Sequence, residues 1–325
     1  MRGLTRAAKR AGEMAFNAGG GAVNWFPGHM AAASRAIRDR LKLADLVIEV
    51  RDARIPLSSA NEDLQSVLSA KRRILALNKK DLANPNIMNV CKTRQAQATF
   101  TFYIQRWLDH FESCKQDCIS INAHSSSSVS QLLGLAELKL KEAISKEATL
   151  LIMVVGVPNV GKSALINSIH RIAASRFPVH DKMKRATVGP LPGVTQDIAG
   201  YKIASQPSIY VLDTPGVLVP SIPDMETGLK LALTDNLVLG VLLCDLVMEV
   251  QRTLCSTFLD FTGDTDEENQ LETLIDMQLT ALRKVFRIPH RPFDETHGPT
   301  SKKLLTLFRS GKLGPFILDD LPDEQ

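Results

Sequence analysis

Cysteine is scarce in this chain: there are five in 325 residues, and none belongs to a Cys-x₂-Cys pair. An odd number of thiols does not support a disulfide framework, and structural zinc sites need ligands at paired spacing. We therefore expect reduced thiols, with neither a structural disulfide nor a zinc site. The five are Cys91, Cys114, Cys118, Cys244 and Cys255.

Long apolar runs are also missing. The best stretch, Leu237–Cys244, has eight residues and is flanked by Asp235 and Asp245, whereas a membrane-spanning helix needs about 20 apolar residues. We therefore expect no transmembrane segment. The sequence leaves peripheral membrane association open.

No single sign of charge dominates, since 39 Lys and Arg against 35 Asp and Glu give a net charge of +4. The distribution is nevertheless uneven. Residues 1–42 and residues 281–315 each carry eight Lys or Arg against two acids, whereas Asp260–Asp276 holds seven acids and no base. Two basic poles favour contact with a polyanion such as RNA, although the residues alone equally allow solvated helix faces.

A phosphate-binding loop stands in the middle of the chain, at Gly156–Ser163, which satisfies the pattern G-x-x-x-x-G-K-[ST]. The apolar run Leu150–Val155 before it predicts a buried strand, and the residues after it predict a helix. In that context, successive N–H groups and the helix N-terminus bind phosphate oxygens. Lys162 would neutralise the β- and γ-phosphates. The residues expected to contact the nucleotide here are Asn159, Val160, Gly161, Lys162, Ser163 and Ala164.

Three residues are candidates for the magnesium site of such a nucleotide enzyme. Ser163 would bind Mg²⁺ through its hydroxyl, and Asp213 would hold it through a water molecule. Thr195 is our choice for the switch threonine that completes the metal shell, with Thr187 as the alternative. The Gly216 N–H would meet the γ-phosphate.

The tetrapeptide Asn78-Lys79-Lys80-Asp81 follows the strand-like run Arg73–Leu77 and predicts guanine recognition. The Asp81 carboxylate can accept hydrogen bonds from guanine N1–H and the 2-amino group. Adenine offers neither donor and would leave a desolvated carboxylate unpaired. We expect Asn78 to brace neighbouring loops and the Lys79 stem to lie along the face of the base.

A second base-binding loop is expected at Asn122-Ala123-His124, after the strand-like run Cys118–Ile121. There the Ala123 N–H would reach guanine O6. Together the loops predict GTP and GDP as ligands.

The order of these motifs is unusual. The guanine tetrapeptide precedes the phosphate loop, and Asp213-Thr-Pro-Gly216 comes last, whereas ordinary GTPases begin with the phosphate loop. If the two ends of the chain are imagined joined, the motifs follow one another in the usual order. The chain only begins at a different point in that order. The chain is therefore expected to be a circularly permuted GTPase.

Further motifs carry a specific resemblance. With the loops above, Trp25–Met30, Ala44–Pro56, Glu226–Leu233 and Phe308–Gly314 resemble the YlqF/RbgA type of circularly permuted GTPases. The resemblance covers residues 25–315 and is closest to the mitochondrial ribosome-associated members. It departs at 93–117 and 247–296, from which nothing is carried over.

The resemblance implies a GTP-hydrolysing factor for assembly of the large ribosomal subunit, which supports mitochondrial translation. Its partners would be that subunit and its ribosomal RNA, and its location the mitochondrial matrix. The resemblance leaves a peripheral position on the matrix face of the inner membrane open. We expect a monomer.

The catalytic group is not obvious. Val217 occupies the position that carries a water-orienting glutamine in Ras-like enzymes, so we expect slow intrinsic turnover. The resemblance favours His29 as the group that orients water, with Lys162 and Thr195 acting on the phosphates. It also implies that Asn159 helps to bind K⁺. Rearrangement of the site by ribosomal RNA is a further candidate.

Alternating strand and helix patterns predict a doubly wound α/β P-loop domain over residues 25–220, and helical patterns predict a C-terminal α-helical, RNA-binding domain over 221–325.

Residues 1–24 are basic, amphipathic and poor in acids, which favours a mitochondrial presequence over a short RNA-binding arm. The permutation makes the C-terminal domain leave the core from the second switch. We therefore expect the nucleotide state to gate ribosome binding.

Two other functions remain open on the residues alone. One is a signalling or trafficking GTPase, although Leu321–Gln325 offers no prenylation signal. The other is a non-hydrolysing RNA-binding scaffold that needs GTP only for folding.

Overall fold

The computed structural model describes residues 23–24, 37–83, 94–141, 149–176, 200–205, 208–212, 214, 221–222, 225–234, 277, 279–289, 298–313 and 317–322. They fall into two compact units, one formed by Met1–Leu237 with Gly314–Gln325 and the other by Val238–Leu313. Residues 225–234 and 317–322, which we expected in the C-terminal domain, lie in the first unit.

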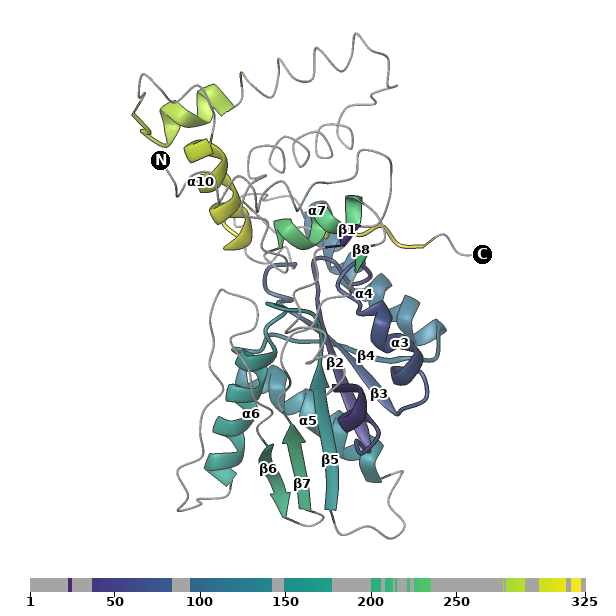
Figure 1. Ribbon diagram of the computed structural model, residues 1–325. Coiled ribbons are helices and arrows are strands. Elements are labelled where there is room, and N and C mark those ends of the chain that lie inside the picture. Colours follow the sequence, from purple (N-terminus) through teal and green to yellow (C-terminus); the bar gives the residue numbers. More distant parts are fainter. Residues whose placement is uncertain are drawn as a thin grey trace, which may run out of the picture. The chain divides into compact units, whose positions relative to one another are not determined.

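The first unit is built on a six-stranded sheet with the strand order β4-β3-β2-β5-β7-β6 (Figure 1). Neighbouring strands are parallel except β6 and β7, which are antiparallel. Each strand overlaps a strand-like run in the sequence, and the doubly wound α/β prediction is confirmed. The strands are β2 (Leu46–Asp52), β3 (Arg73–Asn78), β4 (Asp117–Ser120), β5 (Thr149–Val155), β6 (Gly200–Ser205) and β7 (Ser208–Leu212).

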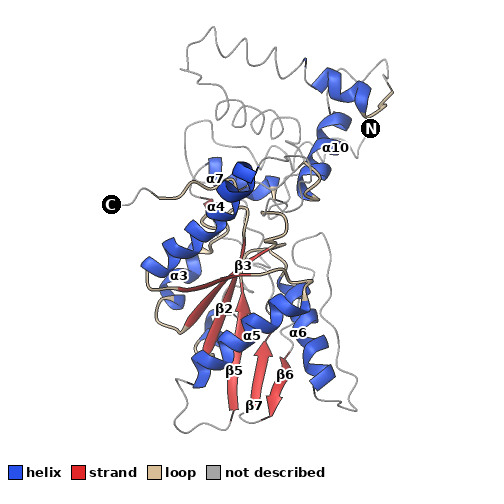
Figure 2. Ribbon diagram, turned by 180° about the vertical axis from the view of Figure 1, so that it is seen from behind, coloured by secondary structure: helices blue, strands red, loops and turns tan. Residues whose placement is uncertain are grey.

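Helices cover both faces of this sheet (Figures 1 and 2). On one face, α3 (Glu62–Leu68) packs Leu64 and Leu68 against Val47 of β2. On the same face, α4 (Arg94–Ser113) packs Trp107 and Phe111 against the leucines of β3. The other face carries α5 (Ser126–Lys141) and α6 (Lys162–Arg176). Because helices lie on both sides, β3 and β5 are apolar along most of their length rather than alternating.

Strand β2 is buried along all seven residues although three of them are charged. Arg51 Nε donates to Glu49 Oε1 at 2.7 Å, and Arg73 Nη1 donates to Glu49 Oε2 at 2.9 Å. Buried charges are tolerated only when they are paired and hydrogen-bonded. The third, Asp52, lies at the carboxyl end of the strand and belongs to a separate network.

Two short strands form a second, antiparallel pair in the first unit. In it β1 (Val23–Asn24) pairs with β8 (Ser221–Ile222), with Val23 opposite Ile222. Val23 and Asn24 are the last residues of the segment that we assigned to a presequence. Helix α7 (Met225–Leu233) follows β8 and coincides with the helical pattern predicted there.

The described part of the second unit is helical. Residues 279–285 form one helix and α10 (Gly298–Arg309) another. Leu279, Leu305 and Phe308 are buried, and Lys303 Nζ lies 5.0 Å from the centre of the Phe286 ring. Within the described residues of both units, no helix is long and apolar enough to cross a membrane.

The chain returns to the first unit through residues 317–322, which are held by a buried carboxylate. Asp319 accepts hydrogen bonds from the Leu57 N–H (2.7 Å), the Ser58 N–H (2.9 Å) and the Ser58 hydroxyl (2.6 Å). Lys230 Nζ of α7 lies 3.3 Å from Asp319 Oδ1. The terminal segment is therefore fixed both to the loop after β2 and to α7.

Asp319→Ala is expected to lower the free energy of unfolding by about 1–2 kcal/mol, because two partly buried backbone N–H groups lose their acceptor. Urea denaturation, followed by the midpoint at constant slope, measures this change. Asp320→Ala is the matched control, since it removes the same charge from the exposed neighbouring position. Equal midpoints for the two variants would show that the carboxylate of Asp319 does not hold the segment.

Candidate nucleotide site

The predicted loops gather at the carboxyl edge of the sheet. The phosphate loop follows β5. The tetrapeptide Asn78–Asp81, called the guanine loop below, lies at the end of β3, and Asn122–His124 follows β4. In a doubly wound sheet, ligands bind at this edge, in the crevice between two neighbouring strands whose connections lead away to opposite sides. Strand β5 is flanked by β2 and β7, so the phosphate loop lies in the centre of that edge.

Two glycines give the phosphate loop its shape. Gly156 and Gly161 have φ angles of 153° and 94°, a region that other residues rarely adopt. A Cβ atom on Gly156 would collide with the Val50 carbonyl oxygen, and one on Gly161 with the Asn78 side chain. The loop is therefore packed closely against β2 and the guanine loop. Because these two positions carry no side chain, the backbone of the loop lines the site.

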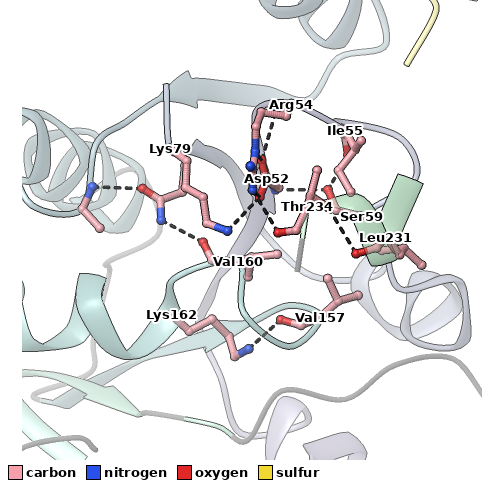
Figure 3. A network of polar contacts seen from close by, with 12 residues as sticks. Asp52, Arg54, Ile55, Ser59, Lys79, Val157, Val160, Lys162, Leu231 and Thr234 are labelled. Carbon is pink, nitrogen blue, oxygen red and sulfur yellow. Dashed lines mark hydrogen bonds and ion pairs between the residues drawn. The ribbon is translucent and has the colours of Figure 1, made fainter. Parts of the chain in front are cut away.

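Helix α6 begins directly after this loop, at Lys162, so its N-terminal N–H groups face the loop. The Lys162 side chain is buried, and its Nζ donates to the Val157 carbonyl at 2.8 Å, across the loop (Figure 3). Asn159 has a positive φ of 57°. Ser163 and Ala164 follow in the first turn of α6, as an anion-binding helix start requires. These residues fit a nucleotide phosphate.

Asn78 joins three loops. Its Nδ2 donates to the Val160 carbonyl of the phosphate loop at 2.8 Å, and its Oδ1 accepts from the Ala123 N–H at 2.9 Å. The side chain is buried. Asn78 therefore braces the phosphate loop and the second base-binding loop at once, as the tetrapeptide led us to expect.

The second base-binding loop is anchored to both helices beneath it. The Asn122 N–H donates to Ser128 Oγ of α5 at 3.0 Å, and Ser168 Oγ of α6 donates to the Ala123 carbonyl at 2.5 Å. We expected the Ala123 N–H to bind guanine O6. In the structure it donates to Asn78, so a contact with O6 requires that N–H to be shared or to exchange partners.

The guanine loop turns tightly after β3. Lys80 N–H donates to the Ile121 carbonyl at 3.1 Å, and Leu82 N–H donates to the Lys79 carbonyl at 2.8 Å. Lys79 has a φ of 63° and its Nζ lies 2.9 Å from Asp52 Oδ2 (Figure 3). Asp81, two residues on, is partly exposed at the same edge of the sheet.

Several predicted site residues lie outside the described residues. They are His29, Thr195 with its alternative Thr187, Asp213, Gly216 and Val217. Their neighbour Thr214 is described: its hydroxyl is buried and donates to the Val154 carbonyl of β5 at 2.6 Å. Thr214 is therefore tied to the strand that carries the phosphate loop.

Sequence reasoning gave no role to Asp52 and Arg54, which form a buried ion pair beside the guanine loop, with Arg54 Nη2 2.8 Å from Asp52 Oδ2. The available signal was a carboxylate and a guanidinium two residues apart at the end of an apolar strand. Nothing in the spacing indicates that Lys79 shares the same carboxylate.

Known proteins share both the sequence pattern and the fold. The family described as a 50S ribosome-binding GTPase matches residues 151–284. Short integuments 2, mitochondrial, from Arabidopsis thaliana is 55% identical over 97% of this chain and 93% of its own length. Mitochondrial ribosome-associated GTPase 1 from Bos taurus is 33% identical over 91% of this chain and 88% of its own length.

Among solved structures, the GDP-bound TM YlqF superposes with a TM-score of 0.59 at 19% identity, covering 89% of this chain and all of that one. At this identity the likeness concerns the fold. The identities to the curated relatives extend over nearly the whole chain, and the loops of the nucleotide site stand in the permuted order. The chain therefore belongs to the YlqF/RbgA family of circularly permuted GTPases.

Proposed function

We propose that this GTPase is a mitochondrial factor that binds the large ribosomal subunit through ribosomal RNA, with its affinity set by the bound nucleotide. The observation that carries the proposal is a basic segment of the second unit, residues 281–313. This segment carries eight Lys or Arg against two acids, whereas the acids of the unit are concentrated at 260–276. The names of the relatives, which specify mitochondria and ribosomes, support the same conclusion.

The basic residues of the second unit are available to a polyanion. Lys284, Arg287, Lys302, Lys303 and Lys312 are exposed, and Arg283 and Arg309 are partly exposed. Arg287 ends the helix at 279–285 with a φ of 53°, a conformation that costs an arginine about 1–2 kcal/mol. Phosphate contacts from such residues supply sequence-independent affinity and release counterions.

Replacing Lys284, Lys302 and Lys312 by glutamine is expected to weaken binding to the large subunit and to flatten its salt dependence. Each lost phosphate contact lowers the slope of log K against log salt by about 0.7–0.9, so three contacts would lower it by roughly 2–3. Binding measured between 50 and 200 mM salt, a range over which the effect is large, provides the slope.

The matched control replaces three exposed cations of the first unit, Arg72, Lys115 and Lys141, by glutamine. This changes the net charge equally and should leave the slope near the wild-type value. If both triple variants had the wild-type slope, the basic residues of the second unit would be a solvated surface and the RNA proposal would fail.

Arg54 contacts the first unit at two places that flank the second unit in the sequence. Its Nη2 donates to the Thr234 carbonyl at 3.0 Å, and its own carbonyl accepts from the Leu318 N–H at 2.7 Å. Arg54 is paired with Asp52 beside the guanine loop. This arrangement supports nucleotide gating, because a change at the guanine loop that moved Asp52 and Arg54 would also alter the contacts of Thr234 and Leu318.

In the nucleotide site, we assign the guanine base to Asn78, Lys79, Asp81 and the 122–123 loop, and the phosphates to Asn159–Ala164 with Gly216. Mg²⁺ would be held by Ser163, Thr195 and Asp213, and it would neutralise charge on the β- and γ-phosphates. Asn159 would contribute to a K⁺ site beside them. His29, Lys162 and Thr195 would support hydrolysis, which is slow until the ribosome stimulates it.

Location in the mitochondrial matrix follows from the basic, acid-poor residues 1–24, read as a presequence. The pairing of Val23 with Ile222 favours cleavage before Val23. We further propose that the protein is monomeric and that any contact with the inner membrane is peripheral, on its matrix face.

A further inference from the structure

Asp52 occupies a central position beside the guanine loop. It is the last residue of β2, and in the parallel register it pairs with Asn78, the first residue of the guanine tetrapeptide. Its side chain is fully buried. A carboxylate in this position must be paired with cations or hydrogen-bond donors, because a buried and unpaired charge is costly.

The Asp52 carboxylate is surrounded by nitrogen donors from two cations (Figure 3). Oδ1 accepts from the Arg54 N–H at 3.0 Å and from Arg54 Nε at 2.9 Å. Oδ2 accepts from Arg54 Nη2 at 2.8 Å and lies 2.9 Å from Lys79 Nζ. One anion therefore orients both an arginine and a lysine.

The charge on this carboxylate is secure. Burial by itself raises the pKa of Asp52, but attraction to Lys79 and Arg54, with their hydrogen bonds, outweighs burial and holds the pKa well below its usual value. Asp52 is therefore ionised at any pH at which the protein works. Linkage gives the sign of its contribution: the stabilisation is present above the ordinary pKa and is lost only as the pH falls through the lowered one.

Lys79 is held in an unfavourable conformation at the other end of this contact. Its φ of 63° is left-handed, and its side chain is 22% exposed, with the ammonium directed into the protein. A free lysine side chain has about 2 kcal/mol of rotamer entropy. The ion pair to Asp52 removes that freedom before a ligand arrives, which is how preorganisation raises affinity.

We propose that Asp52 is a positioning residue for guanine binding: it anchors the Lys79 ammonium so that the lysine stem forms a fixed surface for one face of the base. The inference rests on the proposed role of Lys79 in the nucleotide site. A purely structural role, in which Asp52 serves only Arg54 and the end of α7, makes different predictions. The positioning role requires that Asp52 and Lys79 affect guanine binding through the one contact that they share.

The test compares Asp52→Asn, Lys79→Met and the double variant of the full chain. Methionine keeps an unbranched apolar stem of similar length but cannot be anchored. Each single change is expected to raise the Kd for a fluorescent GDP analogue about tenfold. The double variant should lose about tenfold as well, rather than 100-fold, because residues that act through one contact are not additive.

Pyrophosphate serves as a probe of the phosphate loop alone. Its Kd, measured by competition, should stay within about twofold of wild type in all three variants. Ser59→Ala is the matched control, because Ser59 Oγ accepts from the Asp52 N–H at 3.1 Å and leaves the carboxylate untouched. It should lower the melting temperature and leave GDP affinity unchanged.

Three results would overturn the inference: a 100-fold loss in the double variant, an equal loss of GDP and pyrophosphate affinity, or wild-type GDP affinity in Lys79→Met. The last decides the matter even if Asp52→Asn does not fold, since Lys79→Met leaves the Asp52–Arg54 pair in place. A wild-type protein that bound neither GDP nor pyrophosphate would instead refute the proposed nucleotide site.

Discussion

Asn78→Ala is expected to weaken GDP binding by about 100-fold. The Asn78 side chain donates to the Val160 carbonyl and accepts from the Ala123 N–H. Each buried group left without a partner costs about 1–3 kcal/mol, and a tenfold change in affinity corresponds to about 1.4 kcal/mol. The phosphate loop and the second base-binding loop would then have to be ordered by the nucleotide itself. Equilibrium titration with a fluorescent GDP analogue measures the loss.

Asn78→Asp is an informative companion, because it keeps the acceptor for Ala123 but places an anion against the Val160 carbonyl. It should be at least as harmful despite its similar shape. Asn61→Ala is the matched control: Asn61 is equally buried and caps α3, where its Oδ1 accepts from the Leu64 N–H at 3.3 Å. Loss of that cap costs about 1 kcal/mol of stability and should not change GDP affinity. A small effect of Asn78→Ala would mean that the loops hold their positions without it.

His29→Ala is expected to lower the kcat stimulated by the large subunit by about 10²–10⁴-fold, the usual contribution of a positioned acid, base or water-orienting group. The reason is that Val217 occupies the position of the water-orienting glutamine in Ras-like enzymes and cannot bind the attacking water. GTP affinity should change by no more than about twofold, since the role proposed for His29 lies in the transition state. Steady-state hydrolysis with purified subunits separates kcat from binding.

His110→Ala is the control for loss of a histidine, because the His110 ring packs against Trp107 in α4, with 5.8 Å between the ring centres. It should leave stimulated turnover unchanged. If His29→Ala also kept wild-type turnover, His29 would not act in hydrolysis, and the K⁺ site at Asn159 or the ribosomal RNA would become the leading candidate for the activating group.

The sheet and the main loops were predictable because their signals are local. Strand-like runs such as Arg73–Leu77 and Leu150–Val155 predicted the strands, and the guanine and phosphate loops follow these two runs directly. Strand direction then brings the loops together, because the carboxyl ends of parallel strands meet at one edge. The bracing role of Asn78 followed from the same reasoning.

Contacts between distant segments were not predictable. Helix α4 lies in a stretch where the family resemblance departs, and only the folded sheet shows that Trp107 and Phe111 pack against β3. Asp319 binds backbone groups more than 260 positions earlier in the chain. The Asp52–Lys79 contact depends on the register of β2 and β3 and on the left-handed backbone at Lys79. None of these contacts between distant segments leaves a signal in the sequence.

We propose that the bound nucleotide controls affinity for the large ribosomal subunit. A coupling free energy of about 1–3 kcal/mol would separate the affinities of the two states by roughly 5–150-fold. The most direct test sediments mitochondrial extract through a gradient with either a non-hydrolysable GTP analogue or GDP, and follows this protein. We predict that it migrates with the large subunit in the presence of the GTP analogue and stays near the top with GDP. Equal migration in the two gradients, whether with the subunit or at the top, would contradict the account.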